Sequence, residues 1–565
     1  MSRFLNFQTL ILTGCILLVF YLAILPLFML LYGSVRSAPP GDTGAFFTFK
    51  NYFEAYFDLD FYRLTLNSIL FSLGSCFLTL LIGSYLAWVS ERTNTPFKKM
   101  FVILALIPFI IPGILNTISW ILLLNPRTGM VNVLLQELLN IRTGPFNIYS
   151  LSGMIWVESI HHYPLAFLLM SAAFRNMDTS MEEASLVAGA GNLKTFRHVT
   201  LPLVRPALFS VALLIFIQAI EAFEVPALLG IPAKISVFTS KIFLAVHQFP
   251  PNYGLASSYA VTLLVISMTG VFLYTRIARR GENYATVTGK NYRPRVIDLG
   301  RWKYVTATSA ILIFFIAAVV PALVMLWTSF APYYGIAFDQ YFEKMTLDNY
   351  ISVLKYPLVG IAFRNSFYLS LGAATLVMLL SSVIAWITIK SRIRGRQYLD
   401  YLAFSPIAIP GIVLGISLLW VYLTLPIPVY GTIWILLLAY LTKFMPYGMR
   451  ASSSSMIQIH KELEEAAYAS GGTWFQTFRK IILPLLVPGF VAGWIYVSIV
   501  SLRELSTSIL LYSHDSMVLS VLTFDFFDAG RHTYAAALGV LMMLLLLTMA
   551  FAARLLGARI GIVNK

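Results

Sequence analysis

Long apolar runs separated by short polar segments dominate this chain from one end to the other. Each run is close to the ~20 residues that an α-helix needs to cross the hydrocarbon core of a bilayer. The runs lie near 10–31, 64–89, 100–124, 152–174, 206–230, 256–278, 305–329, 365–389, 399–423, 430–449, 486–511 and 534–557. The first is too long for the apolar core of a signal peptide, so we expect it to be retained. The pattern predicts an all-α polytopic membrane protein with about 12 transmembrane helices.

Composition supports this class and excludes a soluble one. Of the 565 residues, 58% are hydrophobic and only 12% are charged, whereas a soluble domain is roughly 25% charged. Cys15 and Cys76 both lie in apolar runs and show no metal-binding spacing.

The basic residues are distributed unevenly between the polar segments. If the N-terminus is cytoplasmic, the segments on that side hold 28 of the 40 Lys and Arg residues. Cytoplasmic loops of membrane proteins carry such an excess. We therefore expect both termini to be cytoplasmic, and the net charge of +15 indicates topology rather than a nucleic-acid partner.

One polar stretch occurs twice. Glu182–Gly189 with the residues that follow, and Glu464–Gly471 with theirs, align without a gap at a distance of 282 positions. Over 182–206, 11 of 25 residues are identical to their counterparts. An interpretation as two ordinary connecting loops explains the polarity of these stretches but not their repetition.

Each copy predicts two short helices joined at a glycine. Ser180 is placed to cap the first helix, with Glu183 as its reciprocal partner. Gly189 and Gly471 suit the left-handed conformation that ends a helix. A second amphipathic helix should follow and end at Pro202.

Further repeated residues extend this duplication to both halves of the chain. Asn51, Asn67 and Ile111–Ile114 recur 298 positions later, and the offset drops to 282 before the second polar stretch. The first half therefore holds 16 extra residues, which fit an outside loop at 125–150. Six helices separate equivalent points, so the repeat is parallel, about an axis along the membrane normal. We expect a first half at 1–280, a cytoplasmic linker at 281–303 and a second half at 304–565.

The repeated stretches resemble the EAA loop of ABC importer permeases, whose pattern is Glu-Ala-Ala, three residues, Gly, nine residues, Ile-x-Leu-Pro. The second copy matches throughout, and the first departs only at Ser185 and Val199. The resemblance implies the type I ABC importer permease fold, with loops at 180–206 and 462–488 that dock on ATPase subunits. The ATPase-coupling residues implied are Glu182, Glu183, Ala184, Gly189, Glu464, Glu465, Ala466 and Gly471.

The same resemblance implies partners. These are two ATP-binding subunits at the cytoplasmic face, which use ATP and Mg²⁺, and a periplasmic or extracellular substrate-binding protein. The chain itself is expected to bind no cofactor and to be no enzyme, because Thr288-Gly289-Lys290 lacks the rest of a Walker A motif. The segment around 293–302 is similar to the linker of fused ferric-iron permeases. The resemblance thus implies the inner membrane of a bacterial cell and Fe³⁺ as cargo.

Several ionisable residues fall inside the predicted spans. Those near 158–162, 221–224 and 503–504 lie in the outer halves of their spans. Such residues are costly in a bilayer and often mark a transport pathway. The candidate pathway residues are Glu158, His161, His162, Tyr163, Glu221, Glu224, Lys443, Arg503 and Glu504. An offset of 280 pairs Glu224 with Glu504, and Lys443 occupies the position of His161, which argues against a symmetric metal site.

Two interpretations of these residues stay open. They form either an acidic vestibule for a cation or structural pairs, such as Glu158 with a histidine and Glu504 with a basic group such as Arg503. For Fe³⁺, a hard cation, the oxygens of the four glutamates and Tyr163 are the expected ligands, and no metal site is firm.

Other functions also stay open. Permeases of this class carry thiamine, polyamines, sulfate or phosphonates. A secondary transporter driven by an ion gradient would need no ATPase. A membrane-embedded enzyme using Glu158, His161 and His162 is disfavoured, because no zinc-type His-Glu-x-x-His motif is present.

Overall fold

The computed structural model describes residues 2–177, 180–282, 296–335, 338–391 and 393–559, and these residues form helices joined by turns and loops. They divide into two compact units. Unit 1 comprises 1–58, 242–264 and 350–565, and unit 2 comprises 59–241 and 265–349. The predicted halves, 1–280 and 304–565, therefore differ from the compact units, each of which holds the first helix of the other half. The linker predicted at 281–303 lies mostly outside the described residues.

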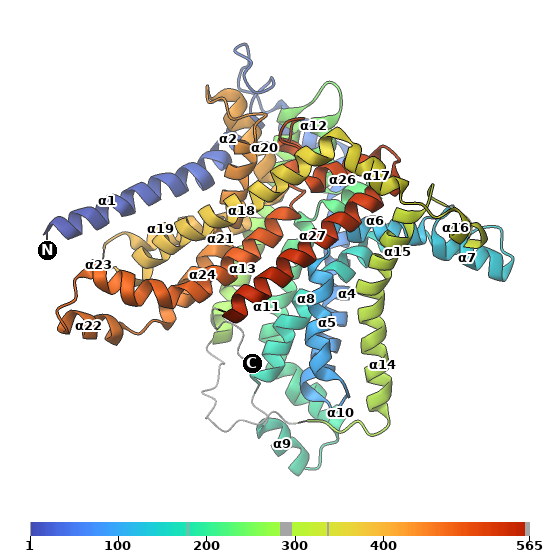
Figure 1. Cartoon of the computed structure of the whole chain (residues 1–565), viewed down its shortest axis with the longest axis horizontal. Helices are drawn as coiled ribbons and strands as arrows, with labels where there is room; N and C mark the ends of the chain where they lie inside the picture. Colours follow the sequence, from blue (N-terminus) through green and yellow to red (C-terminus); the bar gives the residue numbers. More distant parts are fainter. Residues whose placement is uncertain (1, 178–179, 283–295, 336–337, 392, 560–565) are drawn as a thin grey trace. The chain divides into compact units, whose positions relative to one another are not determined.

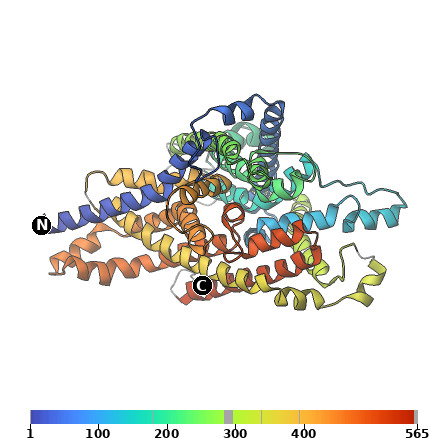
Figure 2. The same cartoon turned by 90° about the horizontal axis from the view of Figure 1, so that it is seen from above.

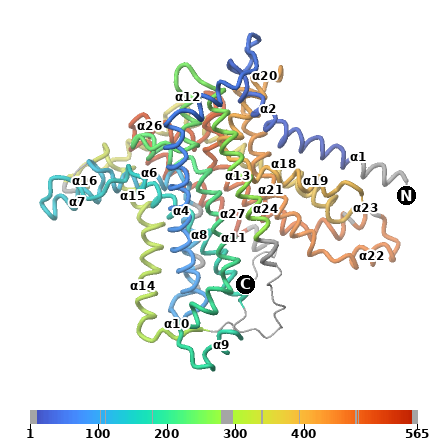
Figure 3. The backbone as a smooth tube through the Cα atoms, turned by 180° about the vertical axis from the view of Figure 1, so that it is seen from behind, coloured from blue at the N-terminus to red at the C-terminus, as the bar shows by residue number. Residues whose placement is uncertain are grey.

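Unit 2 is built on three long helices that run side by side (Figure 1). The helix α4 (Leu59–Arg92) packs along α8 (Leu151–Arg175), and α11 (Leu201–Glu221) contacts both. The hairpin of α5 (Lys98–Ile110) and α6 (Gly113–Leu124) packs against α14 (Trp302–Phe314) and α15 (Val320–Phe330). Figure 3 shows α14 beside α4, with α9 and α10 at one end of this unit.

Shorter elements complete unit 2. They are α7 (Met130–Leu139), α9 (Ser180–Val187), α10 (Asn192–Thr195), α16 (Phe338–Lys344) and the wide π-turns η2 (Phe196–Thr200), η3 (Pro226–Gly230) and η4 (Phe315–Val319). The helix α7 lies within 125–150, where the sequence predicted the extra residues of the first half. The helices α12 (Phe238–His247), α13 (Tyr253–Glu282) and α17 (Asp348–Lys355) straddle the division between the units.

Unit 1 repeats the arrangement with α18 (Pro357–Ala385), α21 (Ile433–Gln458) and α24 (Leu483–Leu502). Its N-terminal helices α1 (Ser2–Val19) and α2 (Leu25–Ser34) pack on α19 (Arg396–Phe404) and α20 (Gly411–Thr424), respectively. Figure 2 shows α1 in dark blue running beside the orange helices. Leu12, Cys15 and Val19 of α1 are buried there against side chains such as Leu399 and Met445, so Cys15 is a core residue.

The remaining elements of unit 1 are mostly short. They are α3 (Lys50–Tyr56), α22 (Lys461–Ala469), α23 (Trp474–Thr477), α25 (Ser508–Leu511), α26 (Leu519–Asp528), the long α27 (His532–Arg559), η1 (Phe20–Ile24), η5 (Trp386–Lys390), η6 (Ser405–Ala408) and η7 (Phe478–Ile482).

Among the described residues, eight helices are long and apolar enough to cross a membrane. A ninth is the pair 396–408 and 411–424, which is bent by 109°. The other three predicted spans correspond to the broken pair α5 and α6, to α8 and to α21. The last two carry Glu158 and Lys443 in their middle parts. The chain is therefore a multi-pass membrane protein.

Four predicted spans prove to be interrupted. The spans at 100–124 and 399–423 break at Ile111-Pro112 and Ile409-Pro410, where both isoleucines are extended, because a proline disfavours helical geometry in the residue before it. The spans at 206–230 and 486–511 end early, at Glu221 and Leu502.

Equivalent residues of the repeat make equivalent bonds, which supports the parallel duplication. The Asn51 amide donates to the carbonyls of Ser34 and Arg36 at 3.0 and 2.8 Å. The Asn349 amide donates to those of Ser329 and Ala331 at 2.9 and 2.7 Å.

The close contact between the two main helices of each unit also repeats, but the glycine lies on opposite partners: on the first helix in unit 2 and on the second in unit 1. A Cβ added to Gly83 of α4 would lie 2.5 Å from the Cβ of Ala166 on α8. In unit 1 the glycine is Gly448 of α21, where a Cβ would lie 2.6 Å from the Ser381 hydroxyl of α18. Small residues allow membrane helices to approach closely, and here one glycine per contact suffices.

Candidate functional site

The two repeated stretches form the same structure. In unit 2, α9 ends at Gly189 with φ 84°, and Ala190 N donates to Ser185 O at 3.0 Å. In unit 1, α22 ends at Gly471 with φ 78°, and Gly472 N donates to Ala467 O at 2.9 Å. These are the left-handed helix ends that the sequence predicted. We call 180–202 and 461–484 the coupling segments, after the role that the resemblance implies for them.

The predicted end of the second helix at Pro202 is wrong. A continuous helical path runs from Asn192 to Glu221 and passes through Pro202. The π-turn η2 immediately precedes Leu201-Pro202, and η7 stands in the same place before Leu483-Pro484. The wider turn shifts the hydrogen-bond ladder where proline lacks an N–H group. The second helix of each coupling segment thus runs directly into a membrane helix. Ser180 is the first residue of α9 in the structure, and its predicted capping bond with Glu183 stays a prediction.

The coupling segments present apolar and acidic side chains to solvent. In unit 2, Val187 and Leu193 are 90% and 82% exposed, and Met181 is also exposed. In unit 1, Leu463 and Tyr468 are exposed on α22. Glu183 and Glu465 are exposed, whereas Glu182 is buried and Glu464 is half-buried. The two adjacent glutamates of each motif therefore face different surroundings.

A buried ion pair occupies the broken part of unit 1. Glu504, just after the end of α24, accepts hydrogen bonds from Lys443 Nζ at 2.7 Å, Ser506 Oγ at 2.8 Å and Thr507 N at 2.9 Å. A Cβ on Gly411, the first residue of α20, would lie 2.5 Å from Lys443 Nζ. The two helix breaks and the middle of α21 therefore meet at one polar cluster.

Unit 2 has a related cluster at the equivalent place. A Cβ on Gly113, the first residue of α6, would lie 3.4 Å from His161 Nε2 and 3.6 Å from Glu224 Cδ. His161 is in the middle of α8, and Glu224 follows the end of α11. Glu221 and Glu224 are both half-buried, whereas Glu158 and Glu504 are buried.

Three further candidate residues of α8 make contacts within unit 2, and one of these contacts was predicted from the sequence. The three residues are Glu158, His162 and Tyr163. His162 Nε2 lies 2.8 Å from Glu158 Oε1, one helical turn away, as the predicted pair of Glu158 with a histidine requires. Tyr163 is buried, and its ring packs near Phe314 of α14, with centroids 6.2 Å apart. Because residues two apart point to nearly opposite sides of a helix, the structure does not bring Tyr163 to the His161 side.

Two details of the predicted pairing need correction. The repeated stretches align at an offset of 282, and Gly113 and Gly411 meet Glu224 and Ser506, which are also 282 apart. Glu504 therefore occupies the position of Ala222, and Arg503 that of Glu221. The pairing of Glu224 with Glu504 at 280 is therefore shifted by two residues. The basic partner of Glu504 is Lys443 rather than Arg503, because α21 carries Lys443 to the start of α20.

This geometry restricts what the clusters can do. The described residues contain no group of three or more His, Cys, Asp or Glu side chains arranged to hold a metal ion. In unit 1, the Lys443 ammonium neutralises Glu504, so a cation gains little there. Gly113 lines the polar cluster of unit 2, and Gly411 lines that of unit 1. Their recurrence 298 positions apart was the sequence signal that could have indicated that both line such a cluster.

The described end of the linker is fixed to unit 2. Ile297 N donates to Arg92 O at 2.8 Å, and Leu299 N donates to Asn94 Oδ1 at 3.1 Å. Hydrogen bonds from Gly300 N and the Asn94 amide lower the pKa of Asp298, because they stabilise its charged form.

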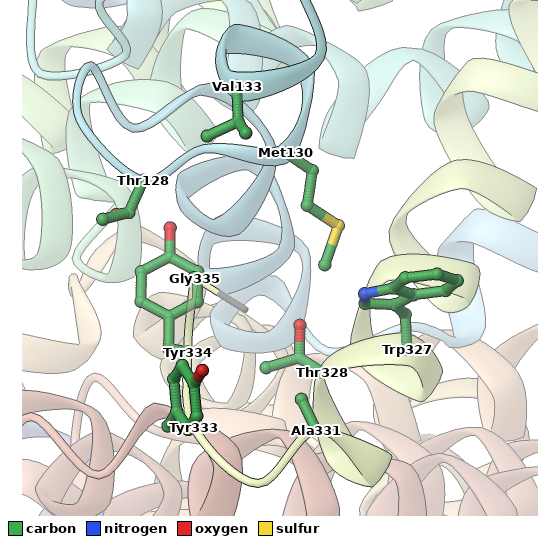
Figure 4. A pocket seen from close by; sticks show the side chains of 9 residues that line it. All are labelled: Thr128, Met130, Val133, Trp327, Thr328, Ala331, Tyr333, Tyr334 and Gly335. Carbon is green, nitrogen blue, oxygen red and sulfur yellow. The ribbon is translucent and has the colours of Figure 1, made fainter. Parts of the chain in front are cut away.

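A small pocket in unit 2 lies between the loop before α7 and the end of α15 (Figure 4). Its lining includes Thr128, Met130, Trp327 and Tyr334 and contains no carboxylate. Met130 and Trp327 face one another across it. The pocket is a packing feature beside the extra residues of the first half and offers a cation no charged ligand.

Comparison with known families accounts for the duplicated coupling segments. The family model described as "binding-protein-dependent transport system inner membrane component" matches the chain twice, at 79–282 and at 377–562. Each match contains one coupling segment and one polar cluster. The chain therefore belongs to this family of transport permeases, with two permease repeats in one polypeptide.

Individual relatives are similar over much of the chain. The ferric transport system permease protein FbpB of Actinobacillus pleuropneumoniae is 26% identical over 82% of this chain, which spans 66% of that protein. The Fe(3+)-transport system permease protein FbpB 2 of Haemophilus influenzae is 23% identical over 82% of this chain and 84% of its own length. The spermidine/putrescine transport system permease protein PotC of Escherichia coli is 27% identical over 34% of this chain and 73% of its own length.

Proposed function

We propose that this chain is the membrane subunit of a binding-protein-dependent ABC importer and forms its whole translocation pathway. The observation that carries the proposal is the pair of coupling segments, each exposed, each turned at a left-handed glycine, and each continuous with a membrane helix. Two equivalent segments suit two ATP-binding subunits, one on each. Those subunits would bind ATP and Mg²⁺ and hydrolyse ATP, and this chain would only transmit the movement.

The exposed side chains of the coupling segments suit this docking. Val187 and Leu193 expose apolar surface that a partner would cover, and Glu183 and Glu465 add charge at the edge of each contact. A substrate-binding protein would deliver cargo on the opposite side of the membrane. We place the chain in a bacterial inner membrane with both termini in the cytoplasm.

We further propose that the cargo is Fe³⁺. Two relatives named as ferric transport permeases align with 82% of this chain. The half-buried Glu221 and Glu224 follow the end of α11 and offer the carboxylate oxygens that a hard cation prefers. A polyamine is the second candidate, because PotC is similar to part of this chain, and the same acids would suit it. The other cargoes and the secondary transporter have no specific support here.

Co-purification tests the class of transporter. The chain expressed with the ATPase subunit from its own genome should retain that subunit in detergent, at two copies for each chain. Deletion of 461–471, which removes α22 and its glycine, should halve the bound ATPase. Failure of the intact, folded chain to retain any ATPase would overturn the proposed function.

Topology gives a second prediction. Reporter fusions after Lys290, which lies outside the described residues, and after Arg396 should read as cytoplasmic, and one near Thr143 as external. The alternating excess of Lys and Arg is the physical reason. An external signal at Lys290 would contradict both the twelve-span topology and the parallel repeat.

A further inference from the structure

A buried ion pair joins the coupling segment of unit 2 to the end of its longest helix. Arg92 is the last residue of α4, and its guanidinium contacts the carboxylate of Glu182 in the first turn of α9. The Arg92 side chain is fully buried and that of Glu182 is 3% exposed. The Thr200 hydroxyl donates to the other oxygen of the same carboxylate.

Unit 1 contains the same pair made with a different cation. Lys390, the last residue of η5, places its Nζ 2.6 Å from Oε1 of Glu464 in α22. Lys390 also donates to the carbonyl of Ile459 at 2.8 Å. The cations are 298 positions apart and the glutamates 282, which are the two offsets of the repeat. The arrangement therefore occurs twice in equivalent places.

Stability alone does not account for these two ion pairs, of which Arg92–Glu182 is fully buried and Lys390–Glu464 is buried at the lysine and half-buried at the glutamate. Removing two charges from water costs more than most ion pairs return, and an apolar pair of similar size is often at least as stable. Such a pair does fix position, because each charge is costly to leave without its partner. In unit 1 the pair holds a segment that has little other anchorage, because every residue of α22 except Glu464 and Ala467 is exposed.

We propose that Arg92–Glu182 and Lys390–Glu464 are positioning struts that transmit movement of the coupling segments to α4 and α18. This inference rests on the proposed function. When a partner moves a coupling segment, the ion pair pulls on the end of a helix that packs closely along α8 or α21. Those helices carry His161 and Lys443, so the movement reaches the polar clusters through packed elements. The second glutamates, Glu183 and Glu465, face outward and are left for the partner.

The natural difference between the two pairs supplies a conservative variant. Because Lys390 already forms the strut in unit 1, Arg92→Lys should keep the function of the strut in unit 2. Arg92→Met and Glu182→Gln should lose it, and Lys390→Met and Glu464→Gln should do the same in unit 1. Arg394→Met is the matched control, because Arg394 is an exposed basic residue four positions after Lys390 and lies outside both coupling segments.

The measurement is Fe³⁺ uptake per ATP hydrolysed, in vesicles that contain the full complex with its binding protein. All variants are compared at equal amounts of assembled complex, because loss of one partner of a buried pair also lowers the folded yield. Per assembled complex, we expect the strut variants to keep ATP hydrolysis but to lose about tenfold in uptake per ATP, within the usual range of coupling between sites. Arg92→Lys and Arg394→Met should match the unmodified chain. The exchanged pair Lys390→Glu with Glu464→Lys should recover most of the loss that either single reversal causes.

The outcomes separate the strut from the proposed function. If the unmodified complex shows no ATP-driven uptake of Fe³⁺ or of spermidine, the proposed function fails. If it transports normally and the strut variants keep the normal uptake per ATP, the strut is wrong. The strut is equally wrong if the exchanged pair performs no better than the single reversals, or if Arg92→Lys behaves like Arg92→Met.

Discussion

Replacing Gly189 and Gly471 with valine will abolish transport and leave the folded chain in the membrane. Both glycines have φ near +80°, a region in which an L-residue costs about 1–2 kcal/mol and a β-branched one more. No atom lies within 4 Å of a Cβ added at either position, so the backbone conformation is the sole obstacle. The valine variants will reorient α9 and α22, and both ATPase contacts will be misplaced.

A matched control lies two residues away in the same segment. Gly191 has φ −71°, and a Cβ added there would meet open space, so Gly191→Val should be tolerated. Uptake and retention of the ATPase subunit are measured for all variants at equal amounts of folded protein. Normal uptake by the Gly189→Val, Gly471→Val double variant would remove the coupling role from these segments.

The second large effect concerns the ion pair of unit 1. Lys443→Met will leave the buried Glu504 carboxylate without its cation, which costs about 3–5 kcal/mol in buried sites. We expect a sharp fall in the yield of monodisperse protein and in its unfolding temperature. Adding Glu504→Gln should restore most of both, because the glutamine oxygen can still accept from Thr507 N and Ser506 Oγ.

The comparison variant is Glu224→Gln in unit 2. Glu224 is half-buried beside His161, and we propose that it contacts the passing cation. This variant should keep its folded yield and lose uptake per folded molecule. A stable Lys443→Met variant that fails only in transport would show that the pair belongs to the pathway and is not structural.

The sequence alone predicted the class and the coupling segments because these depend on local rules. Apolar runs of a given length, an excess of Lys and Arg on one side, and Gly189 and Gly471 at helix ends all act within a short stretch of chain. The duplication at fixed offsets then indicated the parallel repeat. The resemblance to a permease family rested on the same residues.

Features that depend on contacts between residues distant in sequence could not be predicted from local patterns. No local signal distinguishes Glu182, which meets Arg92 from 90 positions earlier, from its neighbour Glu183, which faces solvent. Lys443 was identified as the counterpart of His161, but its contact with Glu504 depends on where α24 breaks. That break follows Leu502, where neither a proline nor a glycine marks the end of the helix. By contrast, the breaks at Pro112 and Pro410 could have been predicted from the prolines themselves. They were missed because the spans were assigned only from the length of the apolar runs.

The most direct test of the account is uptake by vesicles containing purified chain, its ATPase subunit and its binding protein, with radioactive Fe³⁺ outside and ATP inside. We predict accumulation of Fe³⁺ that requires all three proteins and hydrolysable ATP and that is unaffected by collapse of the proton and sodium gradients. ATP-driven uptake of spermidine but not Fe³⁺ would change the cargo and leave the mechanism in place. Uptake by the chain alone, driven by an ion gradient without ATP, would contradict the account.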